Sequence, residues 1–221
     1  MLFNVFERIK NRPDDAFVER IFSKEEANSI LDWNDISKLV RTNTKFFEVI
    51  DKKHNKMNIP WFEHDWEGIY GAVQNKQWIL DKIRSGYGFT ILGQAFYNEK
   101  IYDLSKTLEE ELNQVLDVHV YAAYTKTGKS FEAHSDASCN IILQLDGTSL
   151  WRVYAEKRHD IESGAAKKLT EVFSVDLHPG MILYIPRWLF HKCEPREKRI
   201  SLSFAMMDVV KAREPRINFD L

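Results

Sequence analysis

Cysteine is scarce in this chain of 221 residues, and so are long apolar runs. The cysteines are Cys139 and Cys193, but a chain of this length can bury a core without disulfide support. No window of about 18 apolar residues is available to span a membrane. Residues 1–8 also lack the basic flank and apolar run of a secretory signal. We therefore expect a soluble, cytoplasmic protein with no membrane partner.

The chain also lacks an excess of charge of either sign. Lysine and arginine number 31 against 33 aspartates and glutamates, which gives a formal net charge of −2. No stretch concentrates basic residues as a phosphate-binding surface requires, so direct nucleic-acid binding is not expected. The hydrophobic fraction of 44% and the aromatic fraction of 13% are those of a globular protein, and we expect one domain.

A candidate metal site consists of a His-x-Asp pair and a distant histidine. His134 and Asp136 are two residues apart, so on an extended strand both side chains point the same way. With His191 they offer two imidazoles and one carboxylate, a set that holds a divalent metal on one face and leaves its other positions open. The pair alone is a weak signal. Cys193 could add a thiolate, although a free cysteine is more often a small buried residue.

Short predicted strands surround these residues. Asp146-Gly147 is a tight-turn signal and predicts an antiparallel hairpin between its flanking strands. His178-Pro179-Gly180 is a second turn. A small barrel built from such strands can bring all three candidate ligands to one mouth. The predicted strands span residues 88–92, 118–124, 139–145, 150–154, 173–177, 181–185 and 200–207.

The first half of the chain is more helical. Ser23 and Glu26 form a capping-box signature, and the helix that they open is predicted to include Trp33. Further helices are predicted over 74–84 and 99–116, and a strand over 45–50. The aromatic-rich segment 59–66 is either a lid or a loop that plugs one end of the barrel, and the loop is favoured. We divide the domain, residues 1–221, into a helical and mixed part (1–116), core barrel strands (117–207) and a tail (208–221).

Residues 85–207 carry a family resemblance. In order and spacing, their motifs resemble the JmjC/cupin-type Fe(II)- and 2-oxoglutarate-dependent oxygenases, and within these the ribosomal-protein histidyl hydroxylases. The motifs are Gly88-Phe89-Thr90-Ile91-Leu92, the helix-like run 102–116, the run 120–128, His134-Ser135-Asp136, Gln144-Leu145-Asp146-Gly147, Trp151-Arg152-Val153-Tyr154, Leu177-His178-Pro179-Gly180, Tyr184-Ile185-Pro186 and His191.

The resemblance implies a mostly β fold with flanking helices, built around a double-stranded β-helix (jelly-roll or cupin) barrel. It implies that His134, Asp136 and His191 are the metal ligands and the catalytic residues, with Fe(II) as the metal and 2-oxoglutarate and O2 as cosubstrates. Halogenating relatives lack the carboxylate. Because Asp136 is present, hydroxylation of a C–H bond is the expected reaction.

One departure concerns the cosubstrate. The ribosomal oxygenases bind the distal carboxylate of 2-oxoglutarate with a Lys or Arg fifteen residues after the first metal histidine, where this chain has Ser149. Arg199 and Ser201 resemble the Arg-x-Ser anchor of the wider superfamily, in which Arg forms a bidentate fork. The alternative is an exposed Arg199 beside a turn.

Further cosubstrate contacts are expected from three residues. Asn140 has the strand parity of the ligand pair and resembles the residue that meets the metal-proximal end of 2-oxoglutarate in the asparaginyl hydroxylase of the hypoxia pathway. Tyr124 and Thr125 could add hydroxyl donors.

The substrate stays open between a small molecule, an amino acid and a peptide. The ribosomal oxygenases continue into a dimerisation region and a winged-helix domain, whereas this chain ends soon after its last predicted strand, so the resemblance does not extend to a ribosomal substrate. A monomer and a homodimer are both compatible with the sequence. Two other functions also remain: a metal-dependent cupin enzyme that does not use 2-oxoglutarate (a lyase, isomerase or dioxygenase), and a non-catalytic cupin-like binding protein.

Overall fold

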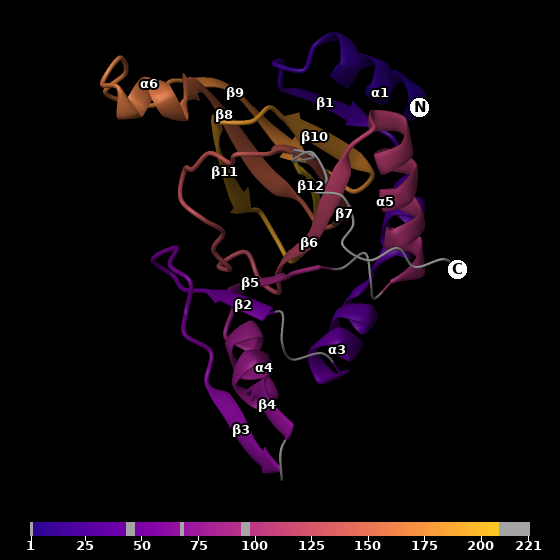
Figure 1. Ribbon diagram of the computed structural model, residues 1–221, viewed down its shortest axis with the longest axis vertical. Coiled ribbons are helices and arrows are strands. Elements are labelled where there is room, and N and C mark those ends of the chain that lie inside the picture. The colour runs from indigo at the N-terminus through magenta and orange to yellow at the C-terminus, as the bar shows by residue number, and fades with distance from the viewer. Residues whose placement is uncertain (1, 43–46, 67–68, 94–97, 208–221) are drawn as a thin grey trace, which may run out of the picture.

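Two β-sheets form the body of the protein in the computed structural model, which describes residues 2–42, 47–66, 69–93 and 98–207 (Figure 1). Within these ranges the larger sheet has seven strands, in the order β1-β10-β7-β12-β6-β5-β2, and the smaller has three, in the order β11-β8-β9. The strands are β1 (Phe17–Arg20), β2 (Phe47–Ile50), β5 (Gly88–Ile91), β6 (Val115–Ala123), β7 (Cys139–Asp146), β8 (Ser149–Lys157), β9 (Glu171–Leu177), β10 (Met181–Ile185), β11 (Leu189–Pro195) and β12 (Arg199–Met207).

A hydrophobic core joins the two sheets. Ile142 of β7 and Leu183 of β10, from the larger sheet, belong to one buried cluster with Trp151 and Val153 of β8 and Leu177 of β9, from the smaller sheet. A larger cluster lies on the other face of the seven-stranded sheet, where the helices pack. Because successive strand residues point to opposite faces, β7 and β10 contribute side chains to both clusters. This arrangement is the predicted jelly roll with flanking helices.

The turn at Asp146-Gly147 does not close the predicted hairpin. β7 pairs with β10 and β12, whereas β8 pairs with β9 and β11, so the described strands on either side of the turn belong to different sheets. His178-Pro179-Gly180 likewise leads from β9 in the smaller sheet to β10 in the larger one. The hairpin prediction was wrong because a tight-turn signal reports a reversal of the chain, not which strand becomes the neighbour.

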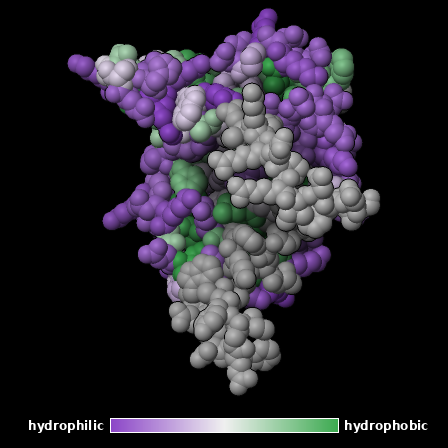
Figure 2. Space-filling model, viewed as in Figure 1, coloured by the Kyte–Doolittle hydropathy of each residue, from purple (hydrophilic) through white to green (hydrophobic). Residues whose placement is uncertain are grey.

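The helices lie beside the larger sheet, except for α6, which follows β8 (Figure 1). None of those in the described ranges has the length and apolar character of a membrane-spanning segment. In this view hydrophilic residues cover most of the described surface, with hydrophobic residues gathered toward the centre (Figure 2). The helices are α1 (Leu2–Asn11), α2 (Lys24–Ile30), α3 (Trp33–Thr42), α4 (Lys76–Arg84), α5 (Glu99–Leu112) and α6 (Arg158–Glu162).

Three helix boundaries differ from the prediction, the simplest being the start of α4 at Lys76 instead of residue 74. The capping box is present: the Ser23 N–H donates to the Glu26 carboxylate at 2.7 Å, and the Glu26 N–H donates to Ser23 Oγ at 3.1 Å. However, α2 ends at Ile30, and Trp33 begins a separate helix. α5 ends at Leu112 rather than at residue 116, because Asn113 adopts a left-handed conformation with φ of 50°.

Residues 61–66 form a strand rather than the predicted loop. β3 (Trp61–Trp66) pairs with β4 (Ile69–Gln74) in a two-stranded sheet that extends away from the two larger ones (Figure 1). The side chains of residues 61–66 lie outside the described part of the structure, so the lid and the plug both stay predictions. β1, β2 and β5 show that the N-terminal part also contributes strands to the larger sheet.

Candidate metal centre and adjoining pocket

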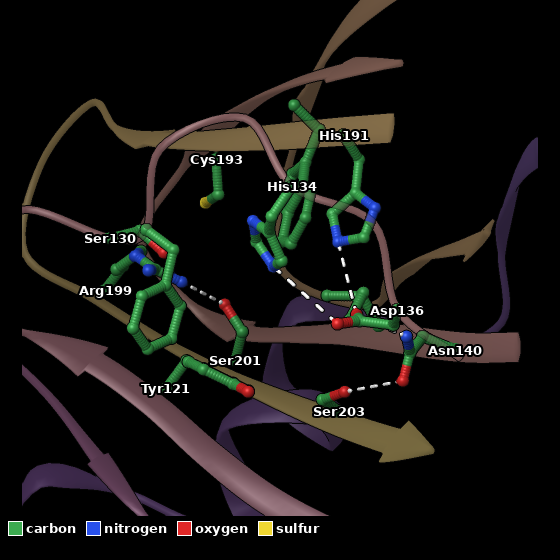
Figure 3. Close-up of a pocket in the computed structure, with 13 residues that line it drawn as sticks. Tyr121, Ser130, His134, Asp136, Asn140, His191, Cys193, Arg199, Ser201 and Ser203 are labelled. Atoms are coloured by element: carbon green, nitrogen blue, oxygen red, sulfur yellow. Dashed lines mark hydrogen bonds and ion pairs between the residues drawn. The ribbon is translucent and has the colours of Figure 1, made fainter. Parts of the chain in front are cut away.

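The three predicted ligands come together. His134 and His191 are paired through their backbones, with N–H to carbonyl distances of 3.1 and 2.8 Å, although 56 residues lie between them in the chain. Asp136 projects to the same place, and the ligand atoms of the three side chains lie within 4.8 Å of one another (Figure 3). The jelly-roll topology therefore converts two distant motifs into one cluster.

Both histidines are oriented as metal ligands. Nδ1 of His134 lies 2.7 Å from the carbonyl oxygen of Glu132, and Nδ1 of His191 lies 3.0 Å from that of Leu189. A carbonyl can only accept a hydrogen bond, so each Nδ1 carries the proton and each Nε2 is left with a free lone pair. These Nε2 atoms face Asp136 at 4.0 and 3.4 Å. A backbone partner at one ring nitrogen is the support that ligating histidines have.

The charge states also suit a cation. Burial lowers the pKa of His134, and the neighbouring His191 lowers it further, which keeps the imidazole neutral near pH 7. Burial alone would raise the pKa of Asp136, but His191, His134 and a hydrogen bond from Asn140 lower it on balance. The Asn140 amide nitrogen lies 2.8 Å from the Asp136 carboxylate. The cluster thus offers two lone pairs and one negative charge, and it fits a divalent metal.

A narrow pocket leads from the cluster into the barrel, between the two sheets. Arg199, Ser201 and Ser203 of β12 line it, together with Tyr121 of β6 and Asn140 of β7 (Figure 3). A wider cavity of about 570 Å³ lies at the outer side and shares the cluster's exposed face. The predicted metal position therefore borders both the inner pocket and the wider cavity.

Arg199 is buried at the inner end of this pocket. It is 2% exposed, so the exposed-turn alternative is wrong. One guanidinium nitrogen donates to Ser201 Oγ at 3.0 Å, and Ser201 Oγ donates in turn to Gln144 Oε1 at 2.8 Å. Among the described residues, no acidic side chain forms an ion pair with Arg199, and its Nε has no hydrogen-bond partner. A buried cation left without an anion is costly, so the arrangement fits a carboxylate ligand.

Successive residues of β12 face opposite sides of the larger sheet. Arg199, Ser201 and Ser203 face the pocket, whereas Ile200, Leu202, Phe204 and Met206 belong to the larger hydrophobic cluster. The neutral Ser149 is fully buried on β8.

Of the three further residues predicted to contact the cosubstrate, one lines the pocket and two do not. Asn140 lies in the pocket as expected. Tyr124 does not: it lines another cavity and packs edge-on against Trp33. Thr125 pairs with the Thr127 hydroxyl, and it is not among the lining residues of the pocket.

The tyrosine that does line the pocket is Tyr121, which the sequence interpretation missed. It lies directly opposite Ser201 across the β6–β12 pairing, so both side chains point to one face. Burial raises the pKa of its phenol above the ordinary value, so the hydroxyl stays a proton donor. Cys193 also lines the pocket, but burial raises the pKa of its thiol, and it is not part of the metal-ligand cluster.

The JmjC domain profile matches residues 92–213, just over half of the chain. The chain belongs to the JmjC family. Among curated relatives of this JmjC chain, ribosomal oxygenase 1 of Rattus norvegicus is 23% identical over 203 residues, covering 88% of this chain and 32% of the relative. The bifunctional lysine-specific demethylase and histidyl-hydroxylase NO66 of Dictyostelium discoideum is 28% identical over 120 residues, covering 49% and 23%.

Solved structures agree on the fold of the JmjC chain. The ribosomal oxygenase YcfD of Escherichia coli superposes with a TM-score of 0.61 at 15% identity, covering 91% of this chain and 51% of YcfD. A YcfD complex with cobalt and 2-oxoglutarate gives a TM-score of 0.59, covering 87% and 48%. The chain thus spans about a third of the rat relative and half of YcfD.

Proposed function

We propose that this JmjC chain is an Fe(II)- and 2-oxoglutarate-dependent oxygenase that hydroxylates a C–H bond of a peptide or protein side chain. The observation that carries the proposal is the joint arrangement of His134, Asp136 and His191 with the uncompensated guanidinium of Arg199 in one pocket. A set of three metal-ligating side chains alone would suit many cupins, and a buried arginine alone would suit any anion. Together they match a dicarboxylate that reaches from a metal to a cation.

Each residue has a definite task. His134 and His191 would bind Fe(II) through Nε2 while their Nδ1 protons stay on backbone carbonyls, and Asp136 would add its carboxylate. When bound, the iron supplies the redox chemistry that couples decarboxylation of 2-oxoglutarate to oxygen insertion. Arg199 and Ser201 would hold the distal carboxylate in place of the lysine that Ser149 replaces.

In the overall reaction, 2-oxoglutarate, O2 and the C–H substrate give succinate, CO2 and a hydroxylated product. One oxygen atom of O2 enters succinate and the other enters the product. The wider cavity over the metal cluster is the place for the substrate, since it opens to the surface and shares His134 and Asp136 with the inner pocket. Its volume of about 570 Å³ accommodates a side chain carried on a peptide.

The names of the relatives support this substrate class, since one is a ribosomal oxygenase and another a histidyl-hydroxylase and lysine-specific demethylase. We also propose that residues 1–221 form a single oxygenase domain, because strands from the N-terminal part complete the sheet that carries the pocket.

The test is formation of succinate by protein reconstituted with Fe(II) under anaerobic conditions and then given 2-oxoglutarate and air. Slow succinate formation without a substrate is expected for the wild type and none for His191→Ala. Calorimetry with 2-oxoglutarate on the Mn(II)-loaded protein serves as the second measurement. Metal binding without either signal would favour the cupin enzyme that does not use 2-oxoglutarate, and absence of metal binding would favour the binding protein.

A further inference from the structure

Arg158, the first residue of α6, contacts the backbone between two of the three ligands. Its Nε donates to Ser135 Oγ at 3.1 Å, and a terminal guanidinium nitrogen donates to the Ser135 carbonyl oxygen at 2.5 Å. Ser135 is buried and stands between His134 and Asp136 in the chain. Two fork-like hydrogen bonds to one residue restrict both the position and the rotation of this segment.

The same arginine also contacts the segment that precedes the third ligand. Its backbone N–H donates to the carbonyl of Trp188 at 2.9 Å, and its guanidinium lies over the Trp188 ring at 4.9 Å. Trp188 in turn donates its N–H to the Asp136 carbonyl at 2.7 Å. Trp188 has a φ of 67°, a conformation that a bulky residue holds only when its surroundings fix it.

The guanidinium of Arg158 contacts neutral groups rather than an acidic side chain. Among the described residues no carboxylate forms an ion pair with it, whereas Arg152, on the same strand-to-helix segment, pairs with Glu171 at 3.0 Å and Glu194 at 3.7 Å. The Arg158 guanidinium is directed at neutral groups, namely Ser135 and the Trp188 ring. Its contacts join the 134–136 segment to the turn before His191.

We propose that Arg158 is a positioning residue of the metal centre: it fixes the spacing between the His134–Asp136 segment and the Trp188 turn, and so sets metal affinity. The inference rests on the proposed function, because it requires the cluster to bind a metal. Among the described residues Arg158 makes no hydrogen bond to a side chain of the three ligands and does not line the inner pocket, so its hydrogen bonds act on the backbone that carries the ligands.

The experiment compares Arg158→Met, Arg158→Lys and Ser135→Ala with wild type, using Mn(II) affinity by calorimetry and the visible spectrum of the Co(II)-loaded protein. Loss of support around metal ligands weakens binding by about 10- to 100-fold, and we expect that range for Arg158→Met. Arg158→Lys keeps the charge but not the fork, so it should rescue little. Ser135→Ala removes one of the two bonds and should cost less.

Arg152→Met is the matched control, an arginine of the same segment with exposed ion pairs, and it should bind Mn(II) like wild type. Thermal unfolding of each protein without metal shows whether the fold is kept. Wild-type Mn(II) affinity and an unchanged Co(II) spectrum in folded Arg158→Lys and Ser135→Ala would overturn the inference. If the wild type itself binds no Mn(II), the proposed function fails and the inference fails with it.

Discussion

Replacing Arg199 by methionine should weaken 2-oxoglutarate binding without lowering the stability of the ligand-free protein. Arg199 is 2% exposed and bonded to the neutral Ser201 hydroxyl, so its charge is desolvated and, among the described residues, has no acidic ion-pair partner. Methionine has similar length and no charge. Without 2-oxoglutarate, Arg199→Met should therefore be as stable as wild type or more stable, because replacement of a buried charge by an apolar side chain is often neutral or favourable.

In the presence of 2-oxoglutarate the effect reverses. Removing the cation leaves a buried carboxylate of the ligand unpaired, which costs about 2 to 5 kcal/mol of binding free energy. At about 1.4 kcal/mol for each tenfold change, the dissociation constant should rise from roughly 30-fold to several thousand-fold. 2-Oxoglutarate should therefore raise the unfolding temperature of the wild-type protein, whereas the same concentration should change that of Arg199→Met little.

The assay is calorimetric titration of 2-oxoglutarate into the Mn(II)-loaded proteins, with thermal unfolding measured alongside. Arg196→Met is the control, since Arg196 lies three residues earlier, is exposed and pairs with Asp176 at 3.1 Å. An unchanged 2-oxoglutarate affinity in folded Arg199→Met would refute the anchor. A loss of affinity together with a large loss of stability in the ligand-free protein would refute the view that the charge lacks an internal partner.

Three further predictions concern other parts of the structure. His191→Ala should abolish Mn(II) binding measured by calorimetry while circular dichroism keeps the wild-type strand signal, and retained affinity would remove His191 from the ligand set. Hydrogen bonding to the Ser23 backbone lowers the pKa of Glu26, so its stabilising contribution is present above the ordinary value of 4.5 and is lost as the pH falls through the lowered value; Glu26→Gln should unfold at lower urea concentration than wild type at pH 7, and the difference should disappear once the pH has fallen through the lowered pKa. Gly147→Ala should lose more than about 1 kcal/mol in urea unfolding, because φ is 64° and a Cβ would overlap a backbone carbonyl; Gly164→Ala, with φ of 75° and open space, is the control and should lose less.

The His134–Asp136 pair and the face of β12 could be read from the sequence because they depend on local parity, whereas His191 was assigned from its motif and the family resemblance. His134 and Asp136 share a face whenever the chain is extended, and the same is true of Arg199 and Ser201. Both inferences needed no knowledge of which strands pair. The structure then added the burial of Arg199, which a sequence rich in neighbouring charges did not indicate.

Features that depend on strand pairing could not be read in this way. Tyr121 faces the pocket because it lies opposite Ser201, and that register becomes visible only once β6 and β12 are paired. Tyr124 falls after the end of β6, so its side chain leaves the pocket. The hairpin at Gly147 failed for the same reason, since local turn chemistry is identical whether the next strand returns to its neighbour or crosses to the opposite sheet.

The alternation along β12 restricts how its sequence can change. Its odd-numbered residues from 199 to 203 reach the ligand pocket, while its even-numbered residues from 200 to 206 complete the hydrophobic cluster. A single-residue insertion or deletion within the strand would exchange the two sets, placing a guanidinium among aliphatic side chains and leucine in the pocket. Diversification of this strand is therefore limited to substitutions that keep its length, and a new cosubstrate preference can arise at alternate positions without disturbing the helices on the other side of the sheet.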